Sequence, residues 1–224
     1  MAGKDGYISV EGDIGVGKTT FIQYICRANG WKEVPEPVDG NPYLESFYAD
    51  PKAFAYVMQD WMQSIRGGTM FHASRSRGMH VMDRSMIGDW AFAYANWKCG
   101  NMTDAEWESY QVKHRRYIRQ TPPPCTVICI DADVPTLLAR IKRRGRVCEQ
   151  GITAEYLTLL KEGLQLSIAM YTKIHNIPVH IVKNNIDGNP SCPGSLSASF
   201  DEEDSNFEEI CGRIRAMHME RVNA

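Results

Sequence analysis

The segment Gly12–Thr19 constrains the fold of this chain more than any other feature of the sequence. Its residues, Gly-Asp-Ile-Gly-Val-Gly-Lys-Thr, fit the pattern G-x-x-x-x-G-K-[ST] of a phosphate-binding P-loop. A short strand is predicted before it at 7–10, and Phe21, Ile22 and Ile25 follow it at helical spacing. Backbone N–H groups at the start of such a helix can cradle phosphate oxygens. A strand, a glycine-rich loop and a helix in this order predict an α/β fold with a phosphate site.

The P-loop supplies the first set of predicted ligand contacts. Lys18 is expected to reach the β- and γ-phosphates of ATP, where it acts catalytically by stabilising charge, and Thr19 is expected to ligate Mg²⁺. The alternative is an ordinary glycine-rich turn between a strand and a helix. The predicted nucleotide contacts are Gly12, Asp13, Ile14, Gly15, Val16, Gly17, Lys18, Thr19 and Thr20.

Five short apolar segments alternate with helical patterns along the chain. We predict an α/β fold with a five-stranded parallel sheet flanked by helices, and with ligands at the carboxyl ends of the strands. No internal repeat or second domain is evident, so 1–224 is predicted to be a single domain. The predicted strands are 7–10, 31–34, 80–82, 126–130 and 179–182; the helical patterns are 43–77 with a new start at Pro51, 89–98, 103–120, 135–141, 157–171 and 207–217.

Composition excludes several classes of protein. The chain has 224 residues, 43% of them hydrophobic, which is enough for a core and excludes a disordered chain. The net charge of -2 provides no overall field for binding nucleic acid or an anionic membrane. Seven cysteines without a C-x-x-C pair, no long apolar run and a polar N-terminus favour a cytoplasmic location. The segment 184–204, rich in Asn, Gly, Pro and Ser, predicts a mobile surface loop.

Two polar groups follow predicted strands and are expected near the P-loop. Glu36 lies between two prolines after the second strand, and Asp83-Arg84-Ser85 ends the third. Taken alone, Glu36 also suits a surface turn, and Asp83 with Arg84 a strand-end ion pair. The P-loop by itself does not separate a GTPase, a transport ATPase and a small-molecule kinase. The N-K-x-D and L-S-G-G-Q segments of the first two classes are absent.

The segment Val34-Pro35-Glu36-Pro37-Val38, taken with the P-loop, resembles the deoxynucleoside kinase family, and most of all its short bacterial deoxyadenosine/deoxyguanosine kinases. The match continues in order through Asn41-Pro42-Tyr43-Leu44 to about Tyr171. The resemblance implies a P-loop kinase fold and ATP-dependent phosphorylation of the 5′-hydroxyl of a deoxynucleoside. It also implies that Glu36 is the catalytic base for that hydroxyl.

The same resemblance implies roles for other residues around the acceptor. Tyr48 would contact the sugar 3′-hydroxyl and Gln59 would pair with the base. Asp83 would serve Mg²⁺, and Arg84 would act catalytically on the 5′-hydroxyl and the phosphates. Arg66 and Asp89 would pair beside the base; keeping both favours a purine or cytosine deoxynucleoside over thymidine. Gln59 and Arg66 lie two turns apart on one helix face, so both are expected to point into one pocket.

The basic run after residue 139 resembles the arginine-rich lid of the family, at about 140–151. Arg140 and Arg144 would close over the transferring phosphate as catalytic and nucleotide-binding groups, and Glu149 would accept from the 3′-hydroxyl. Two departures suggest a wider pocket: Asp39-Gly40 and Ala93 stand where the family often has aromatics. Substitutes for the missing wall are Met58, which we count as a substrate contact, Phe47 and Phe92.

Two rival functions remain at this point. A thymidylate-type monophosphate kinase shares the P-loop, the strand-end motif and the lid, but it needs a cationic site for the phosphate of its acceptor. A nucleotide-binding regulatory module would have no turnover. The carboxylate of Glu36, with Tyr48 and Glu149, favours a neutral acceptor that carries hydroxyl groups. The resemblance also implies a homodimer formed through helices, and it leaves the contacts of the donor base unassigned.

Overall fold

A computed structural model describes residues 6–38, 40–146 and 149–184 of the chain. The predicted helix at 207–217 and the predicted loop at 184–204, apart from its first residue, lie outside these residues.

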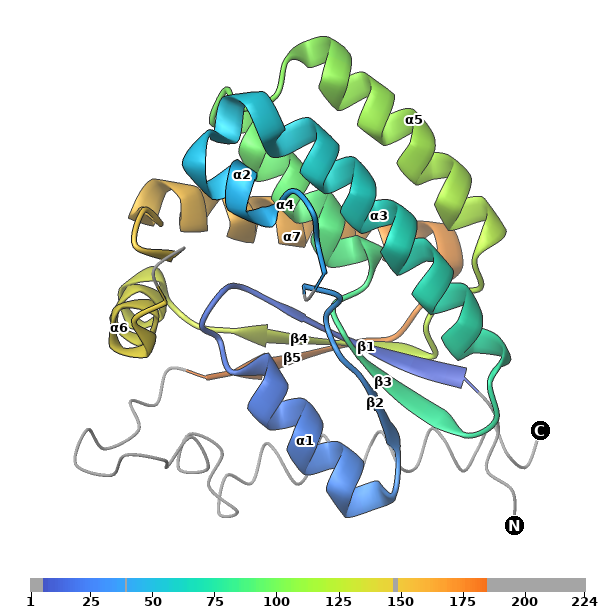
Figure 1. The fold of residues 1–224 in the computed structure, drawn as a ribbon. Helices are drawn as coiled ribbons and strands as arrows, with labels where there is room; N and C mark the ends of the chain where they lie inside the picture. The colour runs from blue at the N-terminus through green and yellow to red at the C-terminus, as the bar shows by residue number, and fades with distance from the viewer. Residues whose placement is uncertain (1–5, 39, 147–148, 185–224) are drawn as a thin grey trace.

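The sheet has five parallel strands in the order β2-β3-β1-β4-β5 (Figure 1). The predicted five-stranded parallel sheet is therefore confirmed. β1 lies at its centre, where Val10 pairs with Asp83 of β3 and Gly12 pairs with Ile130 of β4. This register brings the start of the P-loop beside the end of β3. The strands are β1 (Gly6–Gly12), β2 (Lys32–Val34), β3 (Met79–Asp83), β4 (Thr126–Asp131) and β5 (Val179–Lys183).

Seven helices are present in the described part of the chain, and their ends follow capping chemistry. The side chain of Asp50 accepts from the N–H of Ala53 where Pro51 opens α3, and Thr103 forms a capping box with Glu106 at the start of α5. The helices are α1 (Lys18–Asn29), α2 (Leu44–Ala49), α3 (Pro51–Arg75), α4 (Met86–Lys98), α5 (Asp104–Gln120), α6 (Val134–Arg144) and α7 (Ala154–His175).

Several helix boundaries differ from the sequence prediction; α7, for example, runs from Ala154 to His175 and not from 157 to 171. α4 begins at Met86 and not at Asp89, because the Ser85 side chain accepts from the N–H of Ile87 and caps the helix there. α6 continues past Ile141 to Arg144 and ends at Gly145. Cations in the last turn favour the negative end of the helix dipole, which explains why the basic run stays helical.

Helices cover both faces of the sheet (Figure 1). α1 lies on one face, where Ile8, Val10 and Phe21 belong to one apolar cluster. α3, α4 and α7 lie on the other face, where Tyr7 and Met82 belong to a second cluster. Alternate β1 residues thus serve opposite faces, as the period of a strand requires.

Asn184 corrects the prediction of a surface loop at its first residue. It is 1% exposed, and its backbone N–H donates to the Asp131 carbonyl at 2.8 Å. Its side-chain amide donates to the Val16 carbonyl of the P-loop at 2.8 Å. A polar residue pinned by buried hydrogen bonds has no apolar period, so sequence pattern alone assigns it to a loop.

Within the described ranges, no helix combines the length and apolar character needed to cross a membrane.

α4 and α7 pack closely at Gly163. A Cβ at this position would lie 2.9 Å from Cδ1 of Tyr94 and 3.0 Å from the carbonyl oxygen of Ala91. The nearest Ala91 atoms are backbone, which cannot move aside without shifting α4. This contact sets the distance between α4 and α7. It therefore also affects the position of Asp89, which lies on α4.

We expect Gly163→Ala to lower the free energy of unfolding by about 1–3 kcal/mol, because the methyl group overpacks the helix interface. The matched control is Gly68→Ala, since Gly68 is also helical but nothing lies within 4 Å of a Cβ there. That variant should gain about 0.5–1 kcal/mol from helix propensity. Urea denaturation measures both, and equal effects would contradict the packing argument.

Candidate active site

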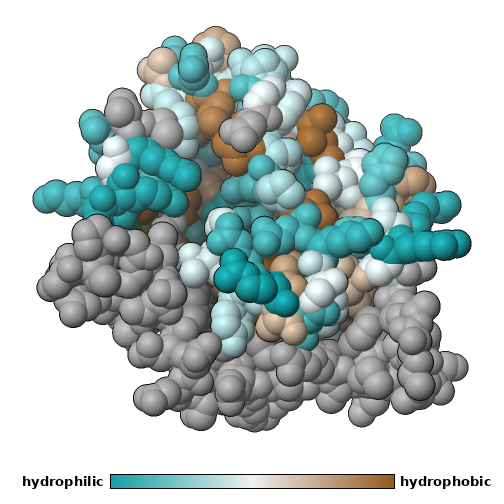
Figure 2. All heavy atoms as spheres, turned by 60° about the horizontal axis from the view of Figure 1, so that its bottom comes forward, coloured by the Kyte–Doolittle hydropathy of each residue, from teal (hydrophilic) through white to brown (hydrophobic). Residues whose placement is uncertain are grey.

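A single cavity of approximately 1650 Å³ joins the P-loop to the helices above the sheet. In the space-filling view hydrophobic surface is visible inside a hollow bordered by hydrophilic groups (Figure 2). The cavity is lined by P-loop residues, by residues at the ends of β2 and β3, and by residues of α2, α3, α4 and the predicted lid. The predicted site residues among its lining are Ile14, Gly15, Gly17, Lys18, Thr19, Thr20, Glu36, Tyr48, Met58, Gln59, Asp83, Arg84, Asp89, Arg140, Arg144 and Glu149.

Four predicted residues do not line the cavity. Val16 is 0% exposed and belongs to the apolar cluster under the P-loop, so its side chain serves the core. Asp13 is buried beside Gly12, and burial raises the pKa of its carboxyl group to about 6. Arg66 lies behind Glu36 and Asp89, both of which face the cavity. The prediction that Arg66 and Gln59 point into one pocket therefore holds only for Gln59.

Lys18 begins α1 and folds back over the P-loop. Its Nζ donates to the carbonyl oxygens of Gly12 and Asp13, at 3.2 and 2.9 Å. Burial, together with the nearby Arg84 guanidinium, lowers the pKa of Lys18 to about 8. These carbonyl oxygens accept the hydrogen bonds of Lys18 that a phosphate oxygen would accept in their place.

Thr19 in α1 and Asp83 at the end of β3 lie within hydrogen-bonding distance of each other. The Thr19 hydroxyl donates to Oδ2 of Asp83 at 3.0 Å, and Oδ1 of Asp83 is buried without a hydrogen-bond partner in the described part of the chain. A hydroxyl and a carboxylate are the hard oxygen ligands that Mg²⁺ prefers. These two residues therefore fit the predicted metal site.

Arg84 occupies a strained turn at the end of β3. Its φ of 67° lies in the left-handed region, which costs a residue with a side chain roughly 1–2 kcal/mol. The turn sends the guanidinium back over the Phe92 ring, at 4.6 Å from the centroid, and Nη1 to within 3.3 Å of Glu36 Oε1. Strain of this kind is concentrated at functional sites.

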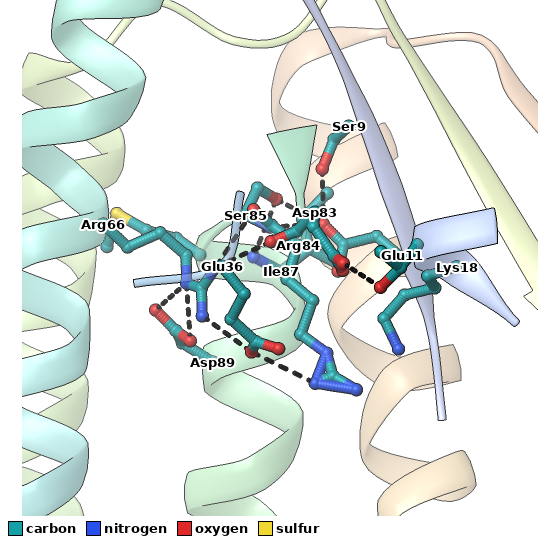
Figure 3. Close-up of polar contacts among 12 residues, drawn as sticks. Ser9, Glu11, Lys18, Glu36, Arg66, Asp83, Arg84, Ser85, Ile87 and Asp89 are labelled. Atoms are coloured by element: carbon teal, nitrogen blue, oxygen red, sulfur yellow. Dashed lines mark hydrogen bonds and ion pairs between the residues drawn. The ribbon is translucent and has the colours of Figure 1, made fainter. Parts of the chain in front are cut away.

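Arg66 donates to two carboxylates, those of Asp89 and Glu36 (Figure 3). Its Nε donates to both carboxylate oxygens of Asp89 at 2.8 Å, and Nη2 donates to Glu36 at 3.2 Å. Burial raises the pKa of Asp89 to about 6, and the Arg66 guanidinium limits that rise. The pair is thus ionised at neutral pH, inside the protein.

Glu36 is charged in the absence of a ligand. Burial alone would raise the pKa of this carboxyl group, but Arg84, Arg66 and Lys18 outweigh burial and lower it. Its side chain keeps 25% of its surface exposed, toward the cavity. A rigid Pro-Glu-Pro segment thus presents an ionised acceptor between two guanidinium groups.

The remaining acceptor residues line the part of the cavity between α2, α3 and α4. Gln59 is 2% exposed, and Met58, Phe47 and Phe92 all reach the cavity. The three substitutes named for the missing aromatic wall are therefore all available. Tyr48 is 37% exposed at the mouth.

The lid arginines have protein partners in this structure. Arg140 donates to the backbone and side-chain oxygens of Asn184, at 3.1 and 3.3 Å. Glu149 pairs with Arg144 at 2.6 Å and with Arg146 at 3.5 Å. Arg140 and Arg144 line the same cavity, and Glu149 here contacts arginines.

Sequence reasoning missed several residues in and around the site, of which Glu11 and Asn96 are polar and fully buried. Glu11 in β1 is 0% exposed and bonds to Ser85, and Asn96 in α4 lines the cavity. The sequence did hold a signal for Glu11: an acidic residue directly follows the predicted buried strand at 7–10. Asn96 gave no comparable signal, since an amide within a helix is common.

We expect Asp89→Asn to cost about 3 kcal/mol or more of unfolding free energy, because it leaves the buried Arg66 charge without its carboxylate. The control is Lys113→Ala, which breaks the exposed pair with Asp60 and should cost about 1 kcal/mol or less. Urea denaturation measures both. A loss for Asp89→Asn as small as that of the control would show that the buried pair is not needed for stability.

Comparison with known proteins agrees with this geometry. The sequence profile described as deoxynucleoside kinase matches residues 8–217. A deoxyguanosine kinase of Dictyostelium discoideum is 34% identical over 157 residues, covering 67% of this chain and 54%, about half, of that protein. A deoxyadenosine/deoxycytidine kinase of Bacillus subtilis is 30% identical over 156 residues, covering 68% of this chain and 72% of that protein.

A solved structure shares the fold. The deoxyadenosine kinase from M. mycoides with bound dCTP superimposes with a TM-score of 0.74 at 23% identity, covering 94% of this chain and 99% of that chain. At this identity the likeness concerns the fold alone. Since the profile spans nearly the whole length, the chain belongs to the deoxynucleoside kinase family.

Proposed function

We propose that this protein transfers the γ-phosphoryl group of ATP to the 5′-hydroxyl of a deoxynucleoside. One observation carries the proposal: an ionised Glu36 faces the same cavity as the P-loop and is held there by Arg66 and Arg84. Phosphoryl transfer needs little covalent chemistry from the protein beyond positioning and charge stabilisation. The cavity supplies both, with a carboxylate on the acceptor side and cations on the donor side.

In the proposed reaction Glu36 accepts the proton of the 5′-hydroxyl while the hydroxyl oxygen forms a bond to the γ-phosphorus. The bond from that phosphorus to the β–γ bridging oxygen breaks, and ADP leaves. Lys18, Arg84, Arg140 and Arg144 would stabilise the charge on the phosphoryl oxygens. Nη1 of Arg84 already lies 3.3 Å from Glu36, and the charge of Lys18 is near enough to lower the pKa of Glu36.

Mg²⁺ is part of the proposal, with Thr19 and Asp83 as its protein ligands. The support is that Oδ1 of Asp83 is buried, has no hydrogen-bond partner among the described residues, and belongs to the carboxylate that accepts from the Thr19 hydroxyl. The ion would supply charge neutralisation to the β- and γ-phosphates.

The nucleoside is proposed to lie between Glu36 and α4, with Tyr48 and Glu149 on the sugar 3′-hydroxyl. Gln59 and Met58 would contact the base, and the Arg66–Asp89 pair would border it. The support for a purine or cytosine base is that the pair is intact and that α4 has Ala93 where the family often has an aromatic. The names of the two relatives, a deoxyguanosine kinase and a deoxyadenosine/deoxycytidine kinase, agree with this choice.

A monophosphate kinase is the weaker candidate. Its acceptor would need cations of its own, but Arg66 and Arg84 on the acceptor side are already paired with Glu36 and Asp89. An added phosphate would face these two carboxylates at close range. Electrostatics therefore favours the uncharged nucleoside.

We infer further that the whole chain, 1–224, is one catalytic domain whose lid is 140–151, and that it works in the cytoplasm as a homodimer. The family resemblance supports the dimer. A reducing compartment is supported by the four cysteines in the described ranges, Cys26, Cys99, Cys125 and Cys129, which are all free thiols.

The substrate is tested by measuring ADP release with ATP and Mg²⁺ over deoxyadenosine, deoxyguanosine, deoxycytidine, thymidine and dTMP. We expect turnover with one or more of the first three nucleosides and the lowest kcat/KM with thymidine. Turnover with dTMP alone would overturn the proposed function. Thymidine as the best substrate would overturn only the assignment of Arg66 and Asp89.

The base is tested by Glu36→Gln. We expect kcat to fall about 100-fold or more while nucleoside still binds, because the amide cannot take the proton. Glu45→Gln is the control, since Glu45 also lines the cavity but is exposed on α2. Steady-state kinetics and calorimetric binding measure both variants. Wild-type turnover in Glu36→Gln would remove Glu36 as the base.

A further inference from the structure

Glu11 is a buried acidic residue that the proposed reaction does not use. It lies near the end of β1, is 0% exposed and does not line the cavity. Alternate residues of a strand share a face, so Ser9 and Glu11 point with Tyr7 to the face covered by α3, α4 and α7. Burying a carboxyl group is costly unless it is hydrogen-bonded. The hydrogen-bond partners of Glu11 therefore indicate its role.

All three hydrogen bonds to Glu11 reach one oxygen. Oε1 accepts from the Ser85 N–H at 2.9 Å, from the Ser85 hydroxyl at 2.5 Å and from the Ser9 hydroxyl at 2.5 Å (Figure 3). Burial raises the pKa of this carboxyl group, and the bonds from Ser85 and Ser9 oppose the rise. Two of the three donors thus belong to the residue that follows Arg84.

The Arg84 turn is held at three points. The Arg84 N–H donates to the Val10 carbonyl at 3.0 Å, and the Arg84 carbonyl accepts from Nη1 of Arg66 at 3.2 Å. Glu11 supplies the third point through Ser85. A left-handed backbone persists only where its surroundings over-determine it. Without the Ser85 anchor, Arg84 is free to return to the ordinary region and to swing its side chain away.

The space between the turn and α4 is matched to the Glu11 side chain. A Cβ at Gly88 would lie 2.7 Å from Oε2 of Glu11 and 3.3 Å from Cδ of Arg84. Glycine is thus needed where α4 passes both side chains. The Arg84 guanidinium leaves this gap toward Glu36, at 3.3 Å.

We propose that Glu11 is a positioning residue for the phosphoryl transfer: its Oε1 anchors Ser85 and so keeps Arg84 in the turn that aims its guanidinium at Glu36. This inference rests on the proposed function, in which Arg84 stabilises the charge on the phosphoryl oxygens. Because Glu11 does not line the cavity, and its hydrogen bonds among the described residues come from Ser9 and Ser85, we expect its loss to act on kcat and not on nucleoside binding.

The experiment compares three variants in the ADP-release assay. Glu11→Ala should lower kcat about 100-fold with the nucleoside KM within about threefold of wild type, as expected for a displaced catalytic group. Glu11→Gln keeps an oxygen that accepts from Ser85 and should recover most of that loss. Ser9→Ala is the matched control: it removes one bond to the same Oε1 and leaves both bonds from Ser85, so its kcat should stay near wild type.

A double-mutant cycle separates positioning from general stability. If Glu11 acts through Arg84, then adding Glu11→Ala to Arg84→Gln lowers kcat no further than Arg84→Gln alone. Thermal unfolding shows whether each variant is folded. If Glu11→Ala is not folded, Glu11→Asp replaces it in the cycle, since the shorter side chain keeps the carboxyl group but cannot reach Ser85.

The outcomes distinguish the inference from the proposed function. A wild-type protein without turnover on any nucleoside overturns the function, and the inference with it. Wild-type activity with unchanged kcat in the Glu11 variant, or with losses that multiply in the double mutant, overturns the inference alone. A loss of kcat in Ser9→Ala as large as that in Glu11→Ala also overturns it.

Discussion

One buried guanidinium connects the parts of this active site. Arg66, on α3, is 1% exposed; it pairs with Asp89 of α4, reaches Glu36 after β2 and donates to the carbonyls of Asp83 and Arg84 at the end of β3. An arginine cannot lose its proton in a protein, so its burial is tolerated only with these acceptors in place. The site geometry therefore depends on a charge that the cavity never contacts.

The same constraint explains how a chain with a net charge of -2 holds concentrated charge. Behind and beside the acceptor space, Glu36 and Asp89 neutralise Arg66 and Arg84. Within the described residues, the hydrogen bonds of Lys18 go to backbone carbonyls. Under the proposed function, the acceptor half would therefore be balanced before a nucleoside enters, and the donor half would keep the charge of Lys18 for an anion. Preorganised charge of this kind costs no rearrangement at the moment of reaction.

Much of the fold and the site could be predicted from the sequence, because the signals are local. The strands, the Asp50 and Thr103 caps and the P-loop each depend on residues a few positions apart. What could not be predicted depends on contacts between distant segments. The position of Arg66 on its helix predicts a residue that faces the pocket, but Asp89 of α4 lies between it and the cavity; the position of Asn184 predicts a loop, but its side chain binds the P-loop. The role that we infer for Glu11 depends on its hydrogen bonds from Ser85, which lies 74 residues away in the sequence.

The lid contact of Glu149 has a thermodynamic consequence. Glu149 neutralises Arg144 and Arg146 within the lid, and only 7% of its side chain is exposed. Under the proposed function, a phosphate that attracts these arginines would release the carboxylate, and a sugar hydroxyl that binds the carboxylate would release the arginines. Both events would break the same ion pairs, so each ligand would lower the cost of binding the other. Linkage requires the two effects to be equal, so Glu149 would couple the donor and acceptor affinities.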